Sequence, residues 1–124
     1  MLLVDTNIIL RYMLNDHAEM SLKAKDILWS NKALLLTQVV AEVIYVLEGV
    51  YKSTRKKTVE VLRKLFTLPT LLIENENIVT LALEKYVQTK LDFVDALLYA
   101  HHKITGLSVE TFDKDLLHAL QEIN

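Results

Sequence analysis

Short apolar runs alternate along the chain with longer segments whose apolar residues recur every three or four positions. The runs predict buried strands, because each is short and bounded by turn or capping residues. They occupy residues 2–4, 34–37, 70–74 and 107–110. Each run is followed by one helical segment or by two. This alternation favours a parallel sheet covered by helices on both faces, which is an α/β fold.

The helical segments combine a helical apolar period with a capping or stop residue at one end. The first runs from about residue 7 to a turn at 15–17, and the others span about residues 18–31, 38–51, 55–66, 77–89, 92–104 and 114–120. Pro69 ends the fourth helical region, and Gly106 is a plausible C-terminal cap. With two glycines and one proline in the chain, helices joined by short loops are favoured over a β-sandwich.

Length and composition set the class of protein. The chain has 124 residues and predicts a single domain over residues 1–124. The absence of cysteine excludes disulfides, thiolate zinc sites and cysteine nucleophiles. The net charge of −2 gives no global basic field, so a polyanion would need local basic patches or bound metal. Without a leader or an apolar run near the ~20 residues of a membrane span, we expect a cytoplasmic protein with no membrane partner.

Four of the sixteen acidic residues stand where ordinary solvated surface is not the natural explanation. Asp5 directly follows the first expected strand, where ligands of open α/β sheets bind. Glu42 interrupts an apolar stretch near the start of a largely buried helix. Asp95 and Asp113 stand near a helix start or a strand end. One fold brings all four to the same end of the sheet, so we expect them to converge.

Each acid also has a purely structural interpretation. Asp5 could shape an Asx turn or cap the first helix, and Glu42 could be a first-turn acid favoured by the helix dipole. Asp92 and Asp95 are three residues apart, which resembles a capping box, and Asp92 as N-cap is the preferred reading. Asp113 could cap the last helix. These alternatives weaken when the four acids are considered together.

A cluster of carboxylates favours hard divalent cations. Four carboxylates in one pocket would raise one another's pKa values, and bound cations remove that repulsion. Mg²⁺ and Mn²⁺ prefer oxygen ligands, so a cluster without His or Cys suits them better than zinc. Two ions ~4 Å apart could activate a water and stabilise the leaving oxygen of a phosphodiester. The pattern therefore predicts metal-dependent hydrolysis of phosphodiesters.

At these residues the chain resembles the PIN-domain nucleases, and most of all the small VapC-type toxins of bacteria and archaea. The resemblance rests on Val-Asp-Thr-Asn at 4–7, Thr-Gln-Val-Val-Ala-Glu-Val at 37–43, Asp-Phe-Val-Asp-Ala-Leu-Leu-Tyr-Ala at 92–100 and Thr-Phe-Asp at 111–113. It implies a three-layer α/β/α sandwich with a central parallel sheet, ribonuclease activity and a homodimer. It also implies a small antitoxin protein that covers the active-site groove.

The resemblance assigns roles to individual residues. It implies an acidic quartet that binds Mg²⁺ or Mn²⁺, formed by Asp5, Glu42, Asp95 and Asp113. It also implies supporting polar roles for Asn7 and Thr111. Further candidates are Asp115 and Asp92 as additional ligands, and Arg11, which shares a helix face with Asn7. Glu110 departs from the family pattern, which more often has an apolar residue before the Thr, and this leaves the edge of the fourth strand open.

Two other functions remain as alternatives. A phosphatase of the haloacid dehalogenase type also places an Asp after its first strand, but it needs a second Asp two residues on, where this chain has Asn7. A catalytically inactive PIN-like interaction module would keep the fold and lose the chemistry, although all four acids are present. The preferred hypothesis is a metal-dependent endoribonuclease that acts as the toxin of a type II toxin–antitoxin pair.

Overall fold

The computed structural model describes residues 1–122, in which three strands and seven helices alternate along the chain. They form two compact units, one of residues Met1–Glu74 and one that begins at Asn75. The fold is an α/β sandwich with a parallel sheet, as the alternation of elements predicts. The described part of the chain holds no helix that is long and apolar enough to span a membrane.

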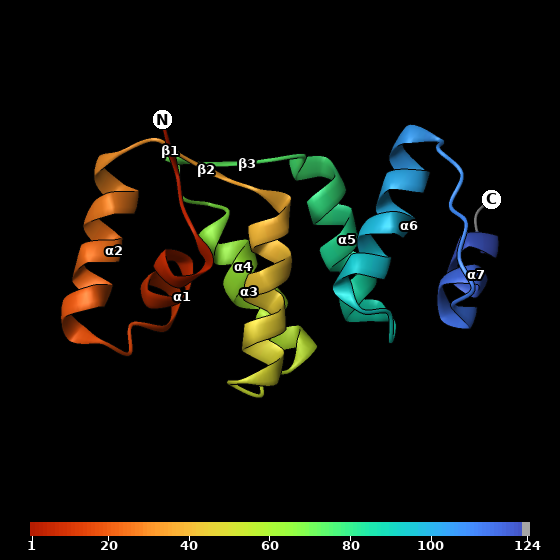
Figure 1. The fold of residues 1–124 in the computed structure, drawn as a ribbon, viewed down its shortest axis with the longest axis horizontal. Helices are drawn as coiled ribbons and strands as arrows, with labels where there is room; N and C mark the ends of the chain where they lie inside the picture. The colour runs from red at the N-terminus through yellow and green to blue at the C-terminus, as the bar shows by residue number, and fades with distance from the viewer. Residues whose placement is uncertain (123–124) are drawn as a thin grey trace. The chain divides into compact units, whose positions relative to one another are not determined.

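The first unit contains the whole described sheet and four helices. Its elements are β1 (Leu2–Leu3), α1 (Thr6–Leu14), α2 (Ala18–Ser30), β2 (Ala33–Leu35), α3 (Thr37–Gly49), α4 (Arg55–Leu65) and β3 (Leu71–Ile73). The strands are parallel in the order β1-β2-β3, with Leu2 beside Ala33 and Leu35 beside Ile73. Figure 1 shows α1–α4 below the three strands. Because the strands are parallel, their carboxyl ends lie at one edge of the sheet.

Successive residues of each strand point to opposite faces of the sheet. Ala33, Leu35 and Leu71 are buried together with apolar residues of the helices. The fully buried residues among the latter are Ile9, Leu28, Val40, Val43 and Leu62. Leu3 and Leu72 lie on the other face and are 68% and 47% exposed. The core of this unit therefore lies between one sheet face and its helices.

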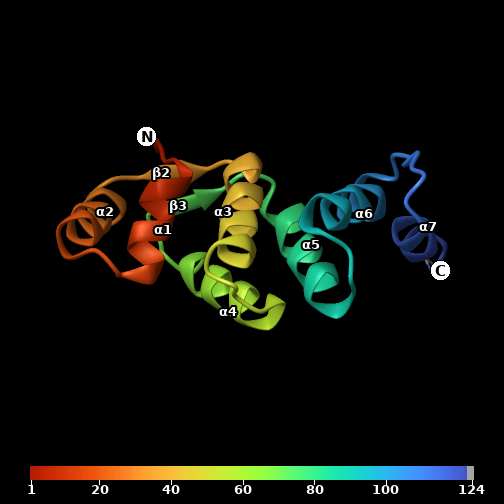
Figure 2. The ribbon, with the colours of Figure 1, turned by 60° about the horizontal axis from the view of Figure 1, so that its bottom comes forward.

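The second unit is helical over its described residues. It contains α5 (Glu76–Gln88), α6 (Phe93–Thr105) and α7 (Lys114–Gln121). Helices α5 and α6 lie side by side in Figures 1 and 2, and the rings of Tyr86 and Phe93 meet edge-on at 6.1 Å. A smaller apolar cluster of Leu91, Tyr99, Leu116 and Ala119 holds α7, and Val109 packs against it. Gly106 ends α6 with a φ of 78°, the left-handed cap that its position predicts.

The expected fourth strand is wrong. Residues 107–110 form no strand, and Leu107 is 66% exposed. A strand needs a neighbouring edge that offers backbone partners, and residues 75–122 contain no other strand. The Leu107 carbonyl instead contacts Nδ1 of His102, and the Leu107 N–H donates to Oγ1 of Thr105. Within this apolar run, Val109 is partly buried against the cluster of Leu91, Tyr99, Leu116 and Ala119.

Candidate functional site

Asp5 stands where the first strand passes into the first helix. It is the N-cap of α1, with an extended backbone at φ −95° and ψ 175°, and its Oδ1 accepts a hydrogen bond of 3.0 Å from the Ile8 N–H. The capping alternative is thus confirmed. A carboxylate can accept several hydrogen bonds or bind a cation as well, and Asp5 is solvent-exposed. Capping therefore fixes the position of this acid without excluding a second role.

Glu42 lies beside the turn that contains Asp5. The Thr6 hydroxyl donates to Oε1 of Glu42, so α3 is joined to the residue next to Asp5. The apolar pattern around Glu42 predicts burial, but its side chain is exposed, while Val40 and Val43 are buried. The reason is that the apolar residues of α3 cover only part of its circumference and Glu42 falls on the remaining part. Glu42 thus lies near the carboxyl end of β1, beside the turn that contains Asp5.

Glu74 is an acid that the sequence analysis missed. It follows β3 as Asp5 follows β1, and its Oε1 accepts a 2.8 Å hydrogen bond from the backbone N–H of Thr37. Its own backbone N–H donates to the Leu35 carbonyl, which extends the ladder between β2 and β3. Leu36, the N-cap of α3, has no side-chain capping bond, so Glu74 supplies one from another strand. The sequence does contain a signal for this acid, because Glu74 directly follows an apolar run as Asp5 does.

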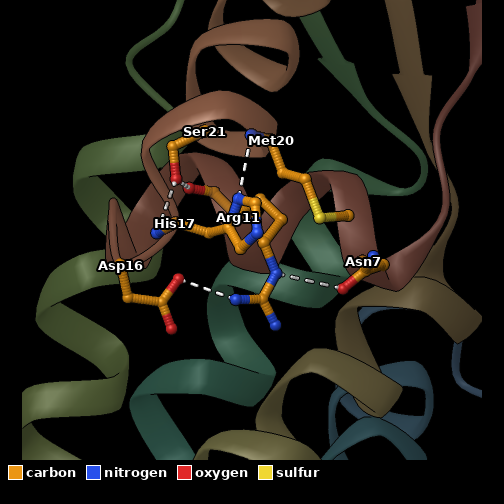
Figure 3. Close-up of polar contacts among 6 residues, drawn as sticks. All are labelled: Asn7, Arg11, Asp16, His17, Met20 and Ser21. Carbon is orange, nitrogen blue, oxygen red and sulfur yellow. Dashed lines mark hydrogen bonds and ion pairs between the residues drawn. The ribbon is translucent and has the colours of Figure 1, made fainter.

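Arg11 holds Asn7 and Asp16 on one side of α1 (Figure 3). Its Nε donates to Oδ1 of Asn7 at 3.3 Å, and its Nη1 contacts Oδ1 of Asp16 at 2.7 Å. Desolvation alone would lower the pKa of Arg11, yet a hydrogen bond with Tyr51 and the charge of Asp16 raise that pKa above its usual value. Because a guanidinium only donates, the Asn7 oxygen must face it, and the Asn7 amide hydrogens are left to act as donors elsewhere.

The same region joins α1 to α2. The Ser21 hydroxyl donates to the Arg11 carbonyl at 2.8 Å, and Ser21 is buried. Nδ1 of His17 accepts a 3.1 Å hydrogen bond from the Met20 N–H and caps α2 (Figure 3). These contacts fix the carboxyl end of α1 and therefore the backbone that carries Arg11. The acid that pairs with Arg11 is Asp16, and a role of Arg11 in binding phosphate stays a prediction.

Asp95 is the partly buried acid of the second unit. Burial raises its pKa most, and the negative charges of Asp92 and Asp113 raise it further. Asp92 is the N-cap of α6, as expected, and accepts a 2.8 Å hydrogen bond from the Asp95 N–H. Asp95 thus lies in the first turn of α6 with two acids near it. Both burial and neighbouring negative charges disfavour the ionised form of a carboxyl group.

Asp113 and Thr111 are arranged around the start of α7. Asp113 is the N-cap of α7 and accepts from the Leu116 N–H at 2.9 Å, so its capping alternative is also confirmed. Oγ1 of Thr111 accepts from the Asp113 N–H at 3.0 Å, which orients the backbone of that acid. Asp115 instead lines a small hollow of about 150 Å³ with Lys90 and His118. The carboxylates that act on Asp95 are those of Asp92 and Asp113.

The donor chemistry of these acids suits a hard cation. The first unit positions Asp5 and Glu42, and the second gathers Asp92, Asp95 and Asp113. Within residues 1–122, no group of three or more His, Cys, Asp or Glu side chains is arranged to hold a metal ion. Oxygen donors without thiolates fit Mg²⁺ or Mn²⁺. The carboxylate oxygens of these residues are therefore of the ligand type that Mg²⁺ and Mn²⁺ prefer.

Comparison with known proteins gives one match. The family model for the PIN domain matches residues 2–121 and so extends over nearly the whole chain. No curated protein and no solved structure matches the chain significantly.

Proposed function

The chain belongs to the PIN domain family, and we propose that it is an endoribonuclease that depends on Mg²⁺ or Mn²⁺. PIN domains are in general nuclease-type hydrolases, so cleavage of a nucleic acid is the activity of the class. The proposal adds RNA as the substrate, a divalent metal as the cofactor, and a biological role as the VapC-type toxin of a type II toxin–antitoxin pair.

The observation that carries the proposal is the PIN family match over residues 2–121, within which the charges of Asp92 and Asp113 act on the partly buried Asp95. Burial, and after it the charges of Asp92 and Asp113, raises the pKa of Asp95 and so disfavours its ionised form. A bound cation would reverse this effect, because it attracts all three carboxylates at once.

The proposed ligands are Asp5, Glu42, Asp95 and Asp113. The first two belong to the unit Met1–Glu74 and the last two to the unit that begins at Asn75. The PIN family match includes all four positions, which supports the proposal of a single PIN-like domain over residues 1–124. Asp92 and Asp115 are the further carboxylates that a metal titration has to test.

The other polar residues have distinct tasks in this scheme. When bound, Mg²⁺ or Mn²⁺ would supply an activated water and stabilise the leaving oxygen of a phosphodiester. Asn7 would donate its amide hydrogens to a phosphate oxygen, since Arg11 holds the amide oxygen on the other side. Thr111 would keep the Asp113 backbone in place through the hydrogen bond from the Asp113 N–H.

The proposed partners follow from the same family. They are an RNA substrate, a small antitoxin protein that covers the active-site groove, and a second copy of the chain in a homodimer. The exposed side chains of Tyr45 and Phe112 offer apolar surface to protein partners. The proposed location is the cytoplasm, where RNA and antitoxin would both be at hand.

The test is cleavage of labelled RNA by purified protein that has been freed of bound inhibitor. We expect cleavage in Mg²⁺ or Mn²⁺ and none in EDTA. Asp95→Asn should lower the rate by a factor of about 10²–10³, a typical cost of removing a group that stabilises developing charge. The matched control is Asp26→Asn, the same isosteric change at an exposed position of α2, which should cleave like the wild type.

Metal binding provides an independent measurement. Calorimetry with Mn²⁺ should show binding that weakens in Asp5→Ser and in Asp95→Asn, one variant from each unit. A wild-type protein that binds Mn²⁺ but cleaves no RNA would indicate an inactive interaction module. Absence of both binding and cleavage would refute the metal-dependent nuclease altogether.

A further inference from the structure

A second hollow is lined by residues of the first unit, and none of the candidate acids is among them. It has a volume of about 640 Å³ and lies between the end of α1, the middle of α2 and the end of α4. Two aromatic side chains, Tyr12 and Trp29, and two cations, Lys25 and Lys64, take part in its lining. This volume is within the roughly 300–1,000 Å³ of small-molecule sites. It is therefore large enough for one nucleotide.

Trp29 is held in place but remains accessible. Its Nε1 donates a 3.0 Å hydrogen bond to the Tyr12 hydroxyl, which fixes the indole against α1. Nζ of Lys25 stands 4.3 Å from the ring centre, in a cation–π contact. The side chain is nevertheless 55% exposed. A large aromatic surface that is both oriented and open to solvent is suited to stacking with a planar ligand.

The charge of the hollow is of one sign. Among the described residues that line it, Lys25 and Lys64 are the charged ones, and none is acidic. This contrasts with the chain as a whole, whose net charge is −2. Lys64 is exposed on the last turn of α4, and Thr67, with its hydroxyl, follows it in the lining. The hollow is thus complementary to an anionic ligand that also has an aromatic face.

We propose that this hollow binds one nucleotide of a single-stranded RNA substrate, with the base on Trp29 and a phosphate at Lys64. Aromatic platforms beside cations are how proteins hold single strands without reading their sequence. The inference rests on the proposed ribonuclease function. Tyr12 is seven residues beyond Asp5, or roughly 10 Å along the helix, so the bound nucleotide flanks the cleaved phosphate rather than containing it.

An acidic peptide with an aromatic side chain is the competing occupant. The observations favour RNA, because the exposed indole of Trp29 stands beside cations, the combination that holds stacked bases of single strands. The experiment below separates the two ligands directly.

Trp29 is the single tryptophan of the chain, so its fluorescence reports on this hollow alone. A short oligouridylate is titrated into the full-length protein in EDTA, which removes any contribution of metal-held phosphate. We expect saturable quenching as a base stacks on the indole. Lys64→Ala should weaken binding about fivefold to tenfold, and high salt should do the same, since part of the affinity is ionic.

Two variants make the experiment specific. Lys23→Ala is the matched control, because it removes the same charge from α2 at a residue outside the lining, and its affinity should stay within twofold of the wild type. For Trp29→Ala, anisotropy of a labelled oligouridylate should show a loss of about tenfold or more, from stacking worth ~1–3 kcal/mol per base. Circular dichroism verifies that each variant is folded.

The outcomes separate this inference from the proposed function. Oligouridylate that quenches nothing, or that binds Lys64→Ala as tightly as the wild type, overturns the nucleotide site even if the enzyme cleaves RNA. Tighter quenching by a peptide of Asp, Glu and Phe than by RNA overturns it in favour of a protein ligand. Saturable, Lys64-dependent quenching in EDTA supports the site even if no metal-dependent cleavage is found.

Discussion

Replacing Asp5 by Ala and by Ser separates its two roles, since the observed role is to cap α1 and the proposed one is to bind metal. Ser keeps a side-chain oxygen for the Ile8 N–H, whereas Ala does not. Neither residue can replace a carboxylate ligand. We therefore expect both variants to lose RNA cleavage and only Asp5→Ala to lose stability.

The loss of stability can be estimated from the geometry of the cap. One capping bond of 3.0 Å is removed, which costs about 1 kcal/mol, within a range of roughly 0.5–2 kcal/mol. For 124 residues the unfolding entropy is about 0.26 kcal/mol/K. Asp5→Ala should therefore lower the Tm by roughly 4 °C, and Asp5→Ser by much less.

The assay is thermal unfolding followed by circular dichroism in EDTA, together with RNA cleavage in Mg²⁺. Thr54→Ala is the matched control, because Thr54 caps α4 through a 3.1 Å hydrogen bond from the Lys57 N–H and carries no carboxylate. It should lose a similar amount of stability and still cleave RNA. The reasoning is refuted if Asp5→Ser cleaves RNA at the wild-type rate, or if it is as unstable as Asp5→Ala.

Three further predictions concern stability, pH and positioning. Leu62→Ala should destabilise the protein by about 2–5 kcal/mol in urea unfolding, since Leu62 is fully buried; a change below 1 kcal/mol would contradict that packing. The pKa of Asp95 is raised in the folded state above its ordinary value of 3.8. In the pH range between these two pKa values the folded protein therefore binds more protons than the unfolded chain. The free energy of unfolding of the wild type accordingly falls as the pH rises through this range. Asp95→Asn should accordingly raise the Tm at pH 7 in EDTA, with an advantage that shrinks toward pH 3, and an advantage that grows on acidification would reverse the assigned sign. Arg11→Lys, which cannot bridge Asn7 and Asp16 with a planar fork, should lower kcat about tenfold with Mn²⁺ affinity unchanged, and loss of Mn²⁺ binding would instead place Arg11 in support of the ligands.

Helix positions were predictable because their signals are local. The expected spans of α2, α4 and α6 agree with the structure to within about two residues, and the caps at Asp92 and Gly106 lie where expected. Capping bonds and apolar periods act within about a turn of the chain, so neighbouring residues suffice to reveal them. The parallel pairing of the first three strands followed from their alternation with helices.

The same local reasoning found the candidate acids without finding their surroundings. Asp5, Asp92 and Asp113 stood out as residues at helix starts, and the structure places each of them as an N-cap. Glu42 was expected to be buried and is exposed, and Glu74 was overlooked although it caps α3. For the four acids of the proposed quartet, binding of a metal ion stays a prediction.

The amino-acid order sufficed for the class of fold, the helix boundaries and a short set of acids, since these depend on residues within a few positions of one another. Three-dimensional packing settled the features that join distant residues. Leu107–Glu110 is no strand, and its Val109 packs instead on the cluster formed by residues of α6 and α7. Thr6 contacts Glu42 across 36 residues, and Glu74 caps α3 across 37. Hydrogen bonds over such separations form only where burial of the core has already brought the backbones together.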